Sequence, residues 1–239
     1  METLAGRKVI VTGASKGIGR AIAERLATEK TSLALVARSG ELLAERASFC
    51  ESKGSKAKAL PCDVGDADAV EKTFKAAIDW LGGIDCLVNN AGLGYFAPFD
   101  QLSLDQFDEM ITTNLRGAFL CAKAVVPRMK ADGGGAIINI ASIAGKYGSD
   151  RSAGYCASKF GLMGMNECMG LDLRPHNIRV TAICPGSVNA PDFRAGRSSQ
   201  MKADQMIQAS DIAEQVVFLL RQPARIFIRE MEVRVTKTS

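Results

Sequence analysis

Residues 8–19 read KVIVTGASKGIG and carry two structural signals in direct succession. The first five, Lys8–Thr12, form a short β-branched run typical of a buried strand. Gly13, Gly17 and Gly19 follow, where a helix is expected to begin. A glycine-rich turn from a strand into a helix N-terminus presents backbone N–H groups, and the helix dipole there favours an anion. The stretch therefore predicts a phosphate-binding turn after the first strand.

The rest of the chain continues this alternation of strands and helices. Strands are expected at residues 8–12, 33–37, 56–60, 84–88, 136–140 and 178–183, with one or two more in 226–235. Helices are expected at residues 17–29, 41–53, 66–81, 103–129, 152–173 and 210–221. Such alternation predicts parallel βαβ units with helices on both faces of the sheet. We find no repeat or linker, so the expectation is one α/β domain over residues 1–239, a doubly wound parallel sheet of Rossmann type with about seven strands.

Capping residues mark three of the expected helix starts. Ser39 and Asp66 precede two of them, and residues 103–106 read SLDQ, which is a capping box. The long helix 103–129 should therefore begin directly after Ser103.

Composition argues against several functional classes. The net charge is only +4, and the densest basic run, residues 53–58, has no interleaved aromatic residue, so no nucleic-acid site is expected. No apolar run is long enough to span a bilayer, and the N-terminus lacks an apolar signal core, so no membrane partner is expected. The seven cysteines are odd in number and include no C-x-x-C pair, which predicts reduced thiols and a cytoplasmic location. With His176 as the only histidine, we expect no metal.

The glycine turn also permits a hydrolase interpretation. Residues 13–17, GASKG, match the G-x-S-x-G elbow of α/β-hydrolases, with Ser15 as nucleophile. Such an elbow needs several preceding strands, and here there is one. The required histidine would have to be His176, in the polar connection RPHNIRV. The hydrolase is therefore the least favoured alternative.

The end of the second strand indicates which dinucleotide is bound. An acid at this position would bind the ribose hydroxyls of NAD, but the chain reads VARSG, with Ala37 and Arg38 there. The planar guanidinium of Arg38 can pair with a 2′-phosphate, and Lys16 in the turn adds a second charge. The alternative is that both side chains merely face solvent. The absence of any acid from 33 to 40 favours NADP.

A phenol and an ammonium occur together in residues 155–159, YCASK. Their spacing places Tyr155 and Lys159 on one face of a helix. Ser142 lies just past the strand 136–140, at the sheet edge where open α/β folds bind ligands. A serine there is often a turn residue and a helical tyrosine often packs, but the three together favour a catalytic site.

These motifs in combination resemble the short-chain dehydrogenase/reductase family, and the resemblance covers nearly the whole chain. The motifs are TGASKGIG at 12–19, CDVGD at 62–66, NNAG at 89–92, TTNL at 112–115, NIASIAG at 139–145, YCASK at 155–159 and CPGSV at 184–188. The resemblance implies a catalytic set of Asn114, Ser142, Tyr155 and Lys159. It implies cofactor contacts from Tyr155, Lys159, Gly13, Ser15, Lys16, Gly17, Ile18, Gly19, Arg38, Asp63, Val64, Asn90, Ala91, Gly92, Pro185, Gly186 and Val188.

The resemblance also implies a reaction, the NADP(H)-dependent reduction of a carbonyl or oxidation of an alcohol. Tyr155 would be the general acid and base, and an ammonium beside it can lower its pKa by about 1–3 units. By family analogy Lys159 would also bind the nicotinamide ribose, Ser142 would orient the substrate oxygen, and Asn114 would hold a water that links Lys159 to solvent. The alternative is a catalytically silent nucleotide-binding regulator.

The sequence also bears on the substrate and on the assembly. Many similar bacterial proteins reduce 3-oxoacyl thioesters, but this chain lacks their C-terminal DGG and has Leu171-Asp172 where they often carry Arg-Glu. Its ending, EMEVRVTKTS, is more similar to family members that act on small hydroxy acids and other short polar alcohols. Residues 187–209 are expected to form a short polar lid. Arg194, Arg197 and Lys202 there could attract an acidic substrate, but a solvated mobile loop is the favoured interpretation. Residues 160–173 are apolar around most of a helix, so with 103–129 they predict a homodimer or two-fold-symmetric tetramer.

Overall fold

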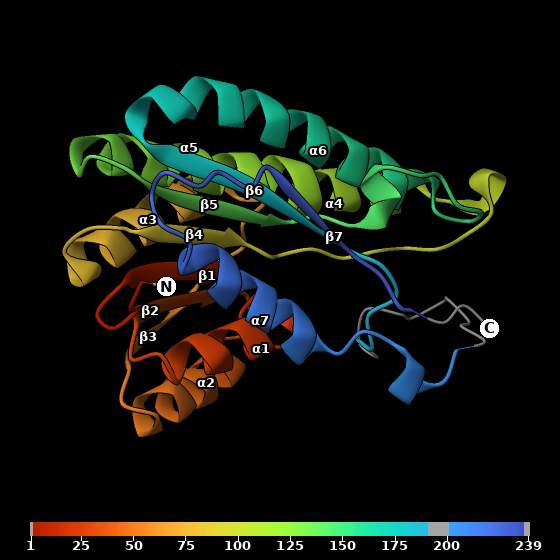
Figure 1. Ribbon diagram of the computed structural model, residues 1–239. Coiled ribbons are helices and arrows are strands. Elements are labelled where there is room, and N and C mark those ends of the chain that lie inside the picture. The colour runs from red at the N-terminus through yellow and green to blue at the C-terminus, as the bar shows by residue number, and fades with distance from the viewer. Residues whose placement is uncertain (1, 191–200, 237–239) are drawn as a thin grey trace.

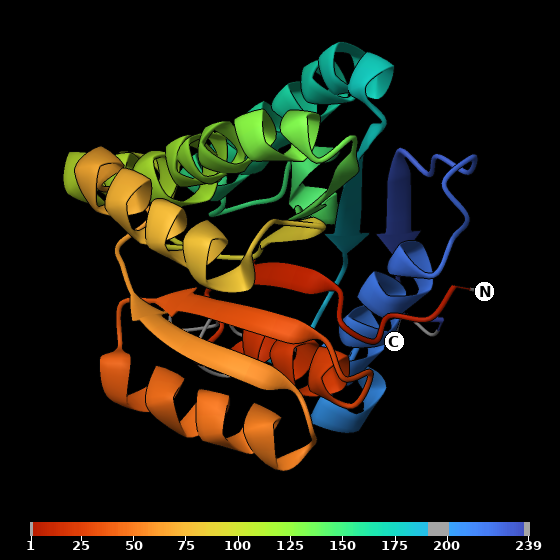
Figure 2. The same ribbon diagram turned by 90° about the vertical axis from the view of Figure 1, so that its left-hand side faces the viewer.

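The computed structural model describes residues 2–190 and 201–236. Within these residues, seven parallel strands form one sheet in the order β3-β2-β1-β4-β5-β6-β7 (Figures 1 and 2). The strands are β1 Lys8–Thr12, β2 Ser32–Ala37, β3 Lys56–Pro61, β4 Cys86–Asn89, β5 Gly135–Ile140, β6 Ile178–Pro185 and β7 Glu230–Val233. The predicted α/β class and parallel sheet are therefore confirmed.

Helices cover both faces of this sheet. One layer holds α1, α2 and α7, and the other holds α3, α4, α5 and α6 (Figure 1). Their bounds are α1 Gly17–Ala27, α2 Gly40–Ser52, α3 Ala67–Leu81, α4 Leu104–Ile111, α5 Gly117–Ala131, α6 Ala153–Leu173 and α7 Ala209–Leu220. No helix in the described part of the chain has the length and apolar character needed to cross a membrane.

The strands are apolar on both faces because both faces are covered. In β1, Val9 and Val11 pack into the core beneath α1 and α7, while Ile10 packs into the core beneath α3 and α5. All three are fully buried. The continuous apolar run of β1 thus reflects a central strand between two hydrophobic layers.

The strand order reverses between β1 and β4, which pair with each other through Val9 and Cys86. To one side of β1 lie β2 and β3, and to the other side lie β4 to β7. Open α/β sheets bind ligands in the crevice outside the carboxyl ends of strands at such a reversal. The segments that follow β1, β2, β4 and β5 converge on this edge.

Two of the expected helix caps form, and the third does not. The Asp66 side chain accepts hydrogen bonds from the backbone of Asp68 and Ala69, and Ser103 and Gln106 form the reciprocal capping box. Ser39 is at the N-cap of α2, but its side chain makes no capping hydrogen bond.

The expected single helix 103–129 is interrupted by a π-helix, Thr112–Arg116, between α4 and α5. A π-turn accommodates one more residue than an α-turn, and such turns often occur at functional sites. Apolar periodicity alone does not reveal it, because the chain remains helical on both sides.

Candidate active site

The glycine turn between β1 and α1 depends on close backbone packing. Gly13 and Gly17 have φ of +64° and +57°, in the left-handed region. A Cβ on Gly19 would lie 2.2 Å from the Gly13 carbonyl oxygen and 2.3 Å from Asn90 Nδ2, whereas a Cβ on Gly17 would meet nothing within 4 Å. Gly19 therefore permits the helix to approach the turn, and Gly17 faces open space.

Thr12 connects this turn to the segment after β4. Its Oγ1 accepts hydrogen bonds from the backbone N–H groups of Asn90 and Ala91, both at 3.0 Å, and donates to the Val88 carbonyl at 3.3 Å. Asn90 Nδ2 returns a bond to the Thr12 carbonyl at 2.9 Å. The sequence prediction did not assign a role to Thr12. A hydroxyl at the end of an otherwise apolar buried strand was the available signal, because buried polar groups need partners.

The N-terminus of α1 is suited to an anion. Lys16 is the N-cap residue and makes no side-chain cap, and the first turn holds no acid. Lys16 and Gly17 are exposed, while Ser15 and Ile18 are partly buried. A helix N-terminus with no capping side chain, beside a glycine that faces open space, fits the pyrophosphate of a dinucleotide.

The residues expected near the adenosine follow β2 and β3. Arg38 comes directly after β2, and its side chain is 67% exposed. After β3, Asp63 Oδ1 accepts a hydrogen bond from the Gly65 backbone at 2.9 Å. Val64 is buried, and Gly117 packs closely against it because a Cβ there would lie 2.8 Å from Val64 Cγ2.

Tyr155 and Lys159 lie in the first two turns of α6 and are both buried. Lys159 Nζ donates to the carbonyl of Ile140, the last residue of β5, at 2.9 Å. The same nitrogen lies 5.8 Å from the centroid of the Tyr155 ring. Burial lowers the pKa of Lys159 from 10.5 to about 8, because the ammonium is removed from water.

Ser142 and Phe96 approach the same tyrosine helix from two other segments. Ser142 follows β5 and caps a short 3-10 helix, Ile143–Gly145, where its Oγ accepts from the Ala144 backbone at 3.1 Å. The Phe96 ring lies 5.7 Å from the Tyr155 ring, at an angle of 58°. Phe96 was not predicted as a site residue.

Asn114, in the π-helix, joins the segment after β4 to α6. Its Oδ1 accepts from the Leu93 backbone at 2.8 Å, and its Nδ2 donates to the Leu93 carbonyl at 2.9 Å and to Ser158 Oγ at 3.0 Å. Ser158 Oγ in turn donates to the Tyr155 carbonyl at 2.8 Å. These contacts connect Asn114 to Leu93 and, through Ser158, to the backbone of Tyr155. Its expected role toward a water and Lys159 stays a prediction, and Ser158 was not foreseen.

The remaining predicted residues follow β4 and β6. Asn90, Ala91 and Gly92 come after β4, and Pro185 is the last residue of β6. The Gly186 N–H donates to the Val233 carbonyl at 2.8 Å, and Val188 forms an isolated parallel bridge with Ile207. Of the expected lid 187–209, residues 187–190 and 201–209 are described, and Lys202 is exposed. Arg194 and Arg197 lie outside the described residues.

The arrangement does not support a Ser–His hydrolase. Ser15 follows β1 at the carboxyl edge of the sheet, whereas His176 precedes β6 at the opposite edge and is exposed. Nor do residues 2–190 and 201–236 contain a group of three His, Cys, Asp or Glu side chains able to hold a metal.

Curated relatives match along nearly the whole chain. Sepiapterin reductase from Chlorobaculum tepidum is 34% identical over 235 residues, which cover 95% of this chain and 96% of that protein. The 3-oxoacyl-[acyl-carrier-protein] reductase of Staphylococcus aureus is 33% identical over 228 residues, 92% of each chain.

Solved structures also match along nearly the whole chain. An alcohol dehydrogenase from the archaeon Thermococcus sibiricus, complexed with 5-hydroxy-NADP, superposes with a TM-score of 0.90 at 30% identity and 98% coverage of each chain. A xylitol dehydrogenase bound to NAD+ superposes with a TM-score of 0.89 at 33% identity, covering 97% of this chain and 99% of that one. The fold is therefore an NAD(P)-binding fold. Residues 7–202 match the family described as short chain dehydrogenase, and the chain belongs to that family.

Proposed function

We propose that this oxidoreductase is an NADP(H)-dependent carbonyl reductase and alcohol dehydrogenase, with Tyr155 as its general acid and base. The observation that supports this most strongly is the buried pair in α6, in which Lys159 donates to the Ile140 carbonyl and lies 5.8 Å from the Tyr155 ring centroid. When bound, the nicotinamide supplies or accepts the hydride, and the residues of the chain provide the proton and the orientation.

Tyr155 gives its proton to the substrate oxygen in reduction and takes it back in oxidation. An ordinary phenol titrates at about 10, which is too high for easy transfer at neutral pH. The Lys159 ammonium stabilises the phenolate and so eases proton loss. Since the Lys159 pKa is itself lowered to about 8, this charge is present at neutral pH and is lost in alkali.

Ser142 orients the substrate oxygen in this proposal. Its Oγ accepts from the Ala144 backbone, which leaves the hydroxyl proton to donate to a carbonyl oxygen. Asn114 keeps the segment after β4 and the first turns of α6 in register through Leu93 and Ser158. Proper geometry of the proton donor is what such positioning contributes to catalysis.

The proposed cofactor is NADP, held by the glycine turn with Arg38 and Lys16 toward its 2′-phosphate. The absence of an acid in residues 33–40 supports this choice. The proposed substrates are ketones or 3-oxoacyl thioesters, with residues 187–209 as the lid over them.

A carbonyl panel tests the proposal directly. Purified protein should oxidise NADPH in the presence of ketones or 3-oxoacyl thioesters, free and carried on an acyl carrier protein. Tyr155→Phe should lose most of its turnover with the same panel. Dinucleotide binding without turnover of any carbonyl or alcohol would instead indicate a regulator, and aryl-ester hydrolysis that disappears in Ser15→Ala would restore the hydrolase alternative.

A further inference from the structure

The fold places an acidic side chain beside the end of β2, where the local sequence has none. Residues 33–40 contain none, but Glu109 of α4 places Oε1 3.7 Å from Arg38 Nη1. The side chains are 67% exposed for Arg38 and 39% for Glu109. The guanidinium proposed to read the 2′-phosphate therefore already faces a carboxylate.

Tyr95 fixes the orientation of that carboxylate. Its hydroxyl donates to Glu109 Oε2 at 2.6 Å, which leaves Oε1 toward Arg38. The Tyr95 backbone is itself held by a contact of 3.3 Å from its N–H to Met110 Sδ. The hydrogen bond to Glu109 raises the pKa of Tyr95, so the phenol remains a donor. Because one oxygen is held, Glu109 is hindered from rotating away when another anion approaches Arg38.

We propose that Glu109 is a specificity-determining residue that weakens the preference for NADP over NAD by competing for Arg38. This rests on the proposed function, in which Arg38 binds the 2′-phosphate. Carboxylate and phosphate are both acceptors for the same planar fork of guanidinium N–H donors. The carboxylate also repels a phosphate at this position, which carries up to about two negative charges.

The competition acts on one of the two dinucleotides. NADH has a neutral hydroxyl where NADPH has the 2′-phosphate, so in the NADH complex Glu109 has no charge to repel at this position. Removing the carboxylate should therefore tighten NADPH and leave NADH nearly unchanged. Since both side chains are partly exposed, the expected gain is modest, about three- to tenfold in NADPH affinity.

The variant Glu109→Gln provides the test because it keeps the shape and an acceptor for Tyr95 while removing the charge. Dissociation constants of NADPH and NADH are measured by nucleotide fluorescence with the full chain and without substrate. Adenosine 2′,5′-bisphosphate and 5′-AMP serve as competing probes of the same end. We expect tighter NADPH and bisphosphate, with NADH and 5′-AMP unchanged, and a smaller gain at high salt because charges are screened.

Asp108→Asn is the matched control, since it removes the same charge from the neighbouring exposed position of α4. Tyr95→Phe should shift the ratio in the same direction as Glu109→Gln but less, because the released carboxylate can turn to solvent. In an Arg38→Ala background, Glu109→Gln should lose the part of its effect that arises from competition.

The experiment distinguishes a failure of the role proposed for Glu109 from a failure of the NADP assignment. If Arg38→Ala weakens NADPH selectively while Glu109→Gln leaves the ratio unchanged, or changes it no more than Asp108→Asn does, then the role of Glu109 is wrong and the NADP assignment stands. If Arg38→Ala weakens both dinucleotides equally, Arg38 does not read the phosphate, and both the NADP assignment and the role of Glu109 are overturned.

Discussion

Lys159 is an ammonium that is 4% exposed and donates a hydrogen bond to the Ile140 carbonyl; among the described residues it forms no ion pair with a carboxylate. Its folded pKa of about 8 lies below the ordinary 10.5, so between these values the unfolded chain binds more protons. Stability should therefore rise with pH across this window. The lowering corresponds to about 3 kcal/mol of unfavourable burial that is fully present below pH 8.

Lys159→Met removes this burial of charge. The free energy of unfolding of the variant, compared with that of wild type, should be highest below about pH 8. This difference should fall as the pH rises toward 10.5. Denaturant unfolding of both proteins without ligand, across this range, measures the change. The variant also leaves the Ile140 carbonyl without its donor, so the pH dependence of the difference is the test. Lys130→Met, which removes an ammonium at an exposed site, is the control.

Tyr155→Phe should separate proton transfer from binding. The ring remains, and with it the contact to Phe96, so NADPH affinity should be nearly unchanged. Turnover should fall about 10²–10⁴-fold or more, as for loss of a general acid. In the oxidation direction the wild-type rate should rise with pH and this rise should be missing in the variant. An active variant with an unaltered pH profile would mean that the proton comes from another group.

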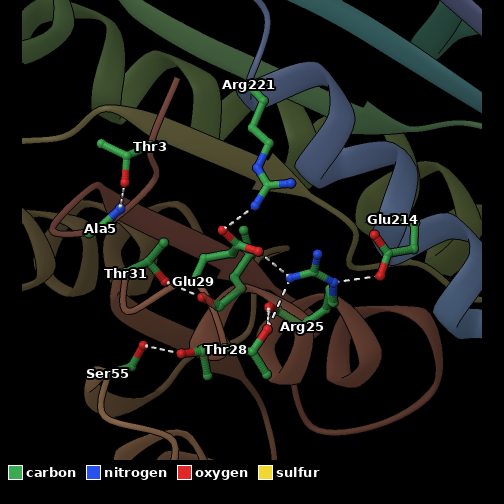
Figure 3. A network of polar contacts seen from close by, with 11 residues as sticks. Thr3, Ala5, Arg25, Thr28, Glu29, Thr31, Ser55, Glu214 and Arg221 are labelled. Carbon is green, nitrogen blue, oxygen red and sulfur yellow. Dashed lines mark hydrogen bonds and ion pairs between the residues drawn. The ribbon is translucent and has the colours of Figure 1, made fainter. Parts of the chain in front are cut away.

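Helices α1 and α7 are joined by a four-residue charge network (Figure 3). Arg25 of α1 pairs at 2.6 Å with Glu29, which lies in the turn just after α1. Arg25 also binds Glu214 of α7, and Glu29 binds Arg221, just after α7, at 2.6 Å. The Glu29 side chain is only 15% exposed, so it is less screened by solvent than the other acid. This network fastens the helix that follows the glycine turn to the helix that follows the expected lid.

Glu29→Gln should lower the free energy of unfolding by about 1 kcal/mol at neutral pH. Burial raises the Glu29 pKa, but the hydrogen bonds from Arg25 and Arg221 outweigh it, and the net pKa is below its ordinary value of 4.5. The stabilisation is thus present above pH 4.5 and is lost as pH falls through the lowered pKa. Urea unfolding at several pH values measures this loss. Glu51→Gln, an exposed acid in α2, should show little effect, and an equal effect would contradict the prediction.

For helices and strands, the sequence predicts those features that depend only on residues close together in the chain. The Asp66 cap and the Ser103–Gln106 box formed because each needs only its own helix start. The Ser39 side-chain cap failed to form, and the π-helix at Thr112–Arg116 was missed. The latter contains Asn114, whose partners Leu93 and Ser158 come from distant segments.

The same limit applies to the candidate site. Motif spacing placed Tyr155 and Lys159 on one buried face, because helical geometry fixes that relation. The meeting of Arg38 with Glu109 depends on how α4 packs beside the end of β2, and no local pattern contains that information.

Assembly concerns the whole molecule, and α6 has an apolar outer face. Ala157, Phe160, Gly164, Cys168 and Leu171 are exposed along it, with Phe160 at 47% and Leu171 at 67%, and Glu167 is an exposed acid on the same side. On the neighbouring α5, Phe119 is 47% exposed. Large exposed apolar patches usually mark interfaces.

We therefore expect a homodimer or a two-fold-symmetric tetramer that buries α5 and α6. Light scattering at micromolar concentration should give a multiple of 25.4 kDa, and Phe160→Glu should reduce the mass toward the single chain. Phe49→Glu, on α2 in the other helix layer, should leave it unchanged. A wild-type mass of one chain would disprove the prediction.

The π-helix also affects how this gene can change length. Its wide turn takes up one residue more than an α-turn, so the helices on either side keep about the relation that a continuous α-helix would give them. Deleting one residue from Thr112–Arg116 would close the turn to ordinary α-helix, with Met110 still beside Gly154 and Glu109 still near Arg38. The change would fall on Asn114, whose contacts with Leu93 and Ser158 are made from this turn. Loss of a single codon here should therefore spare the packing of α4 and α5, whereas the same loss inside either helix would rotate its two parts by about 100° relative to each other.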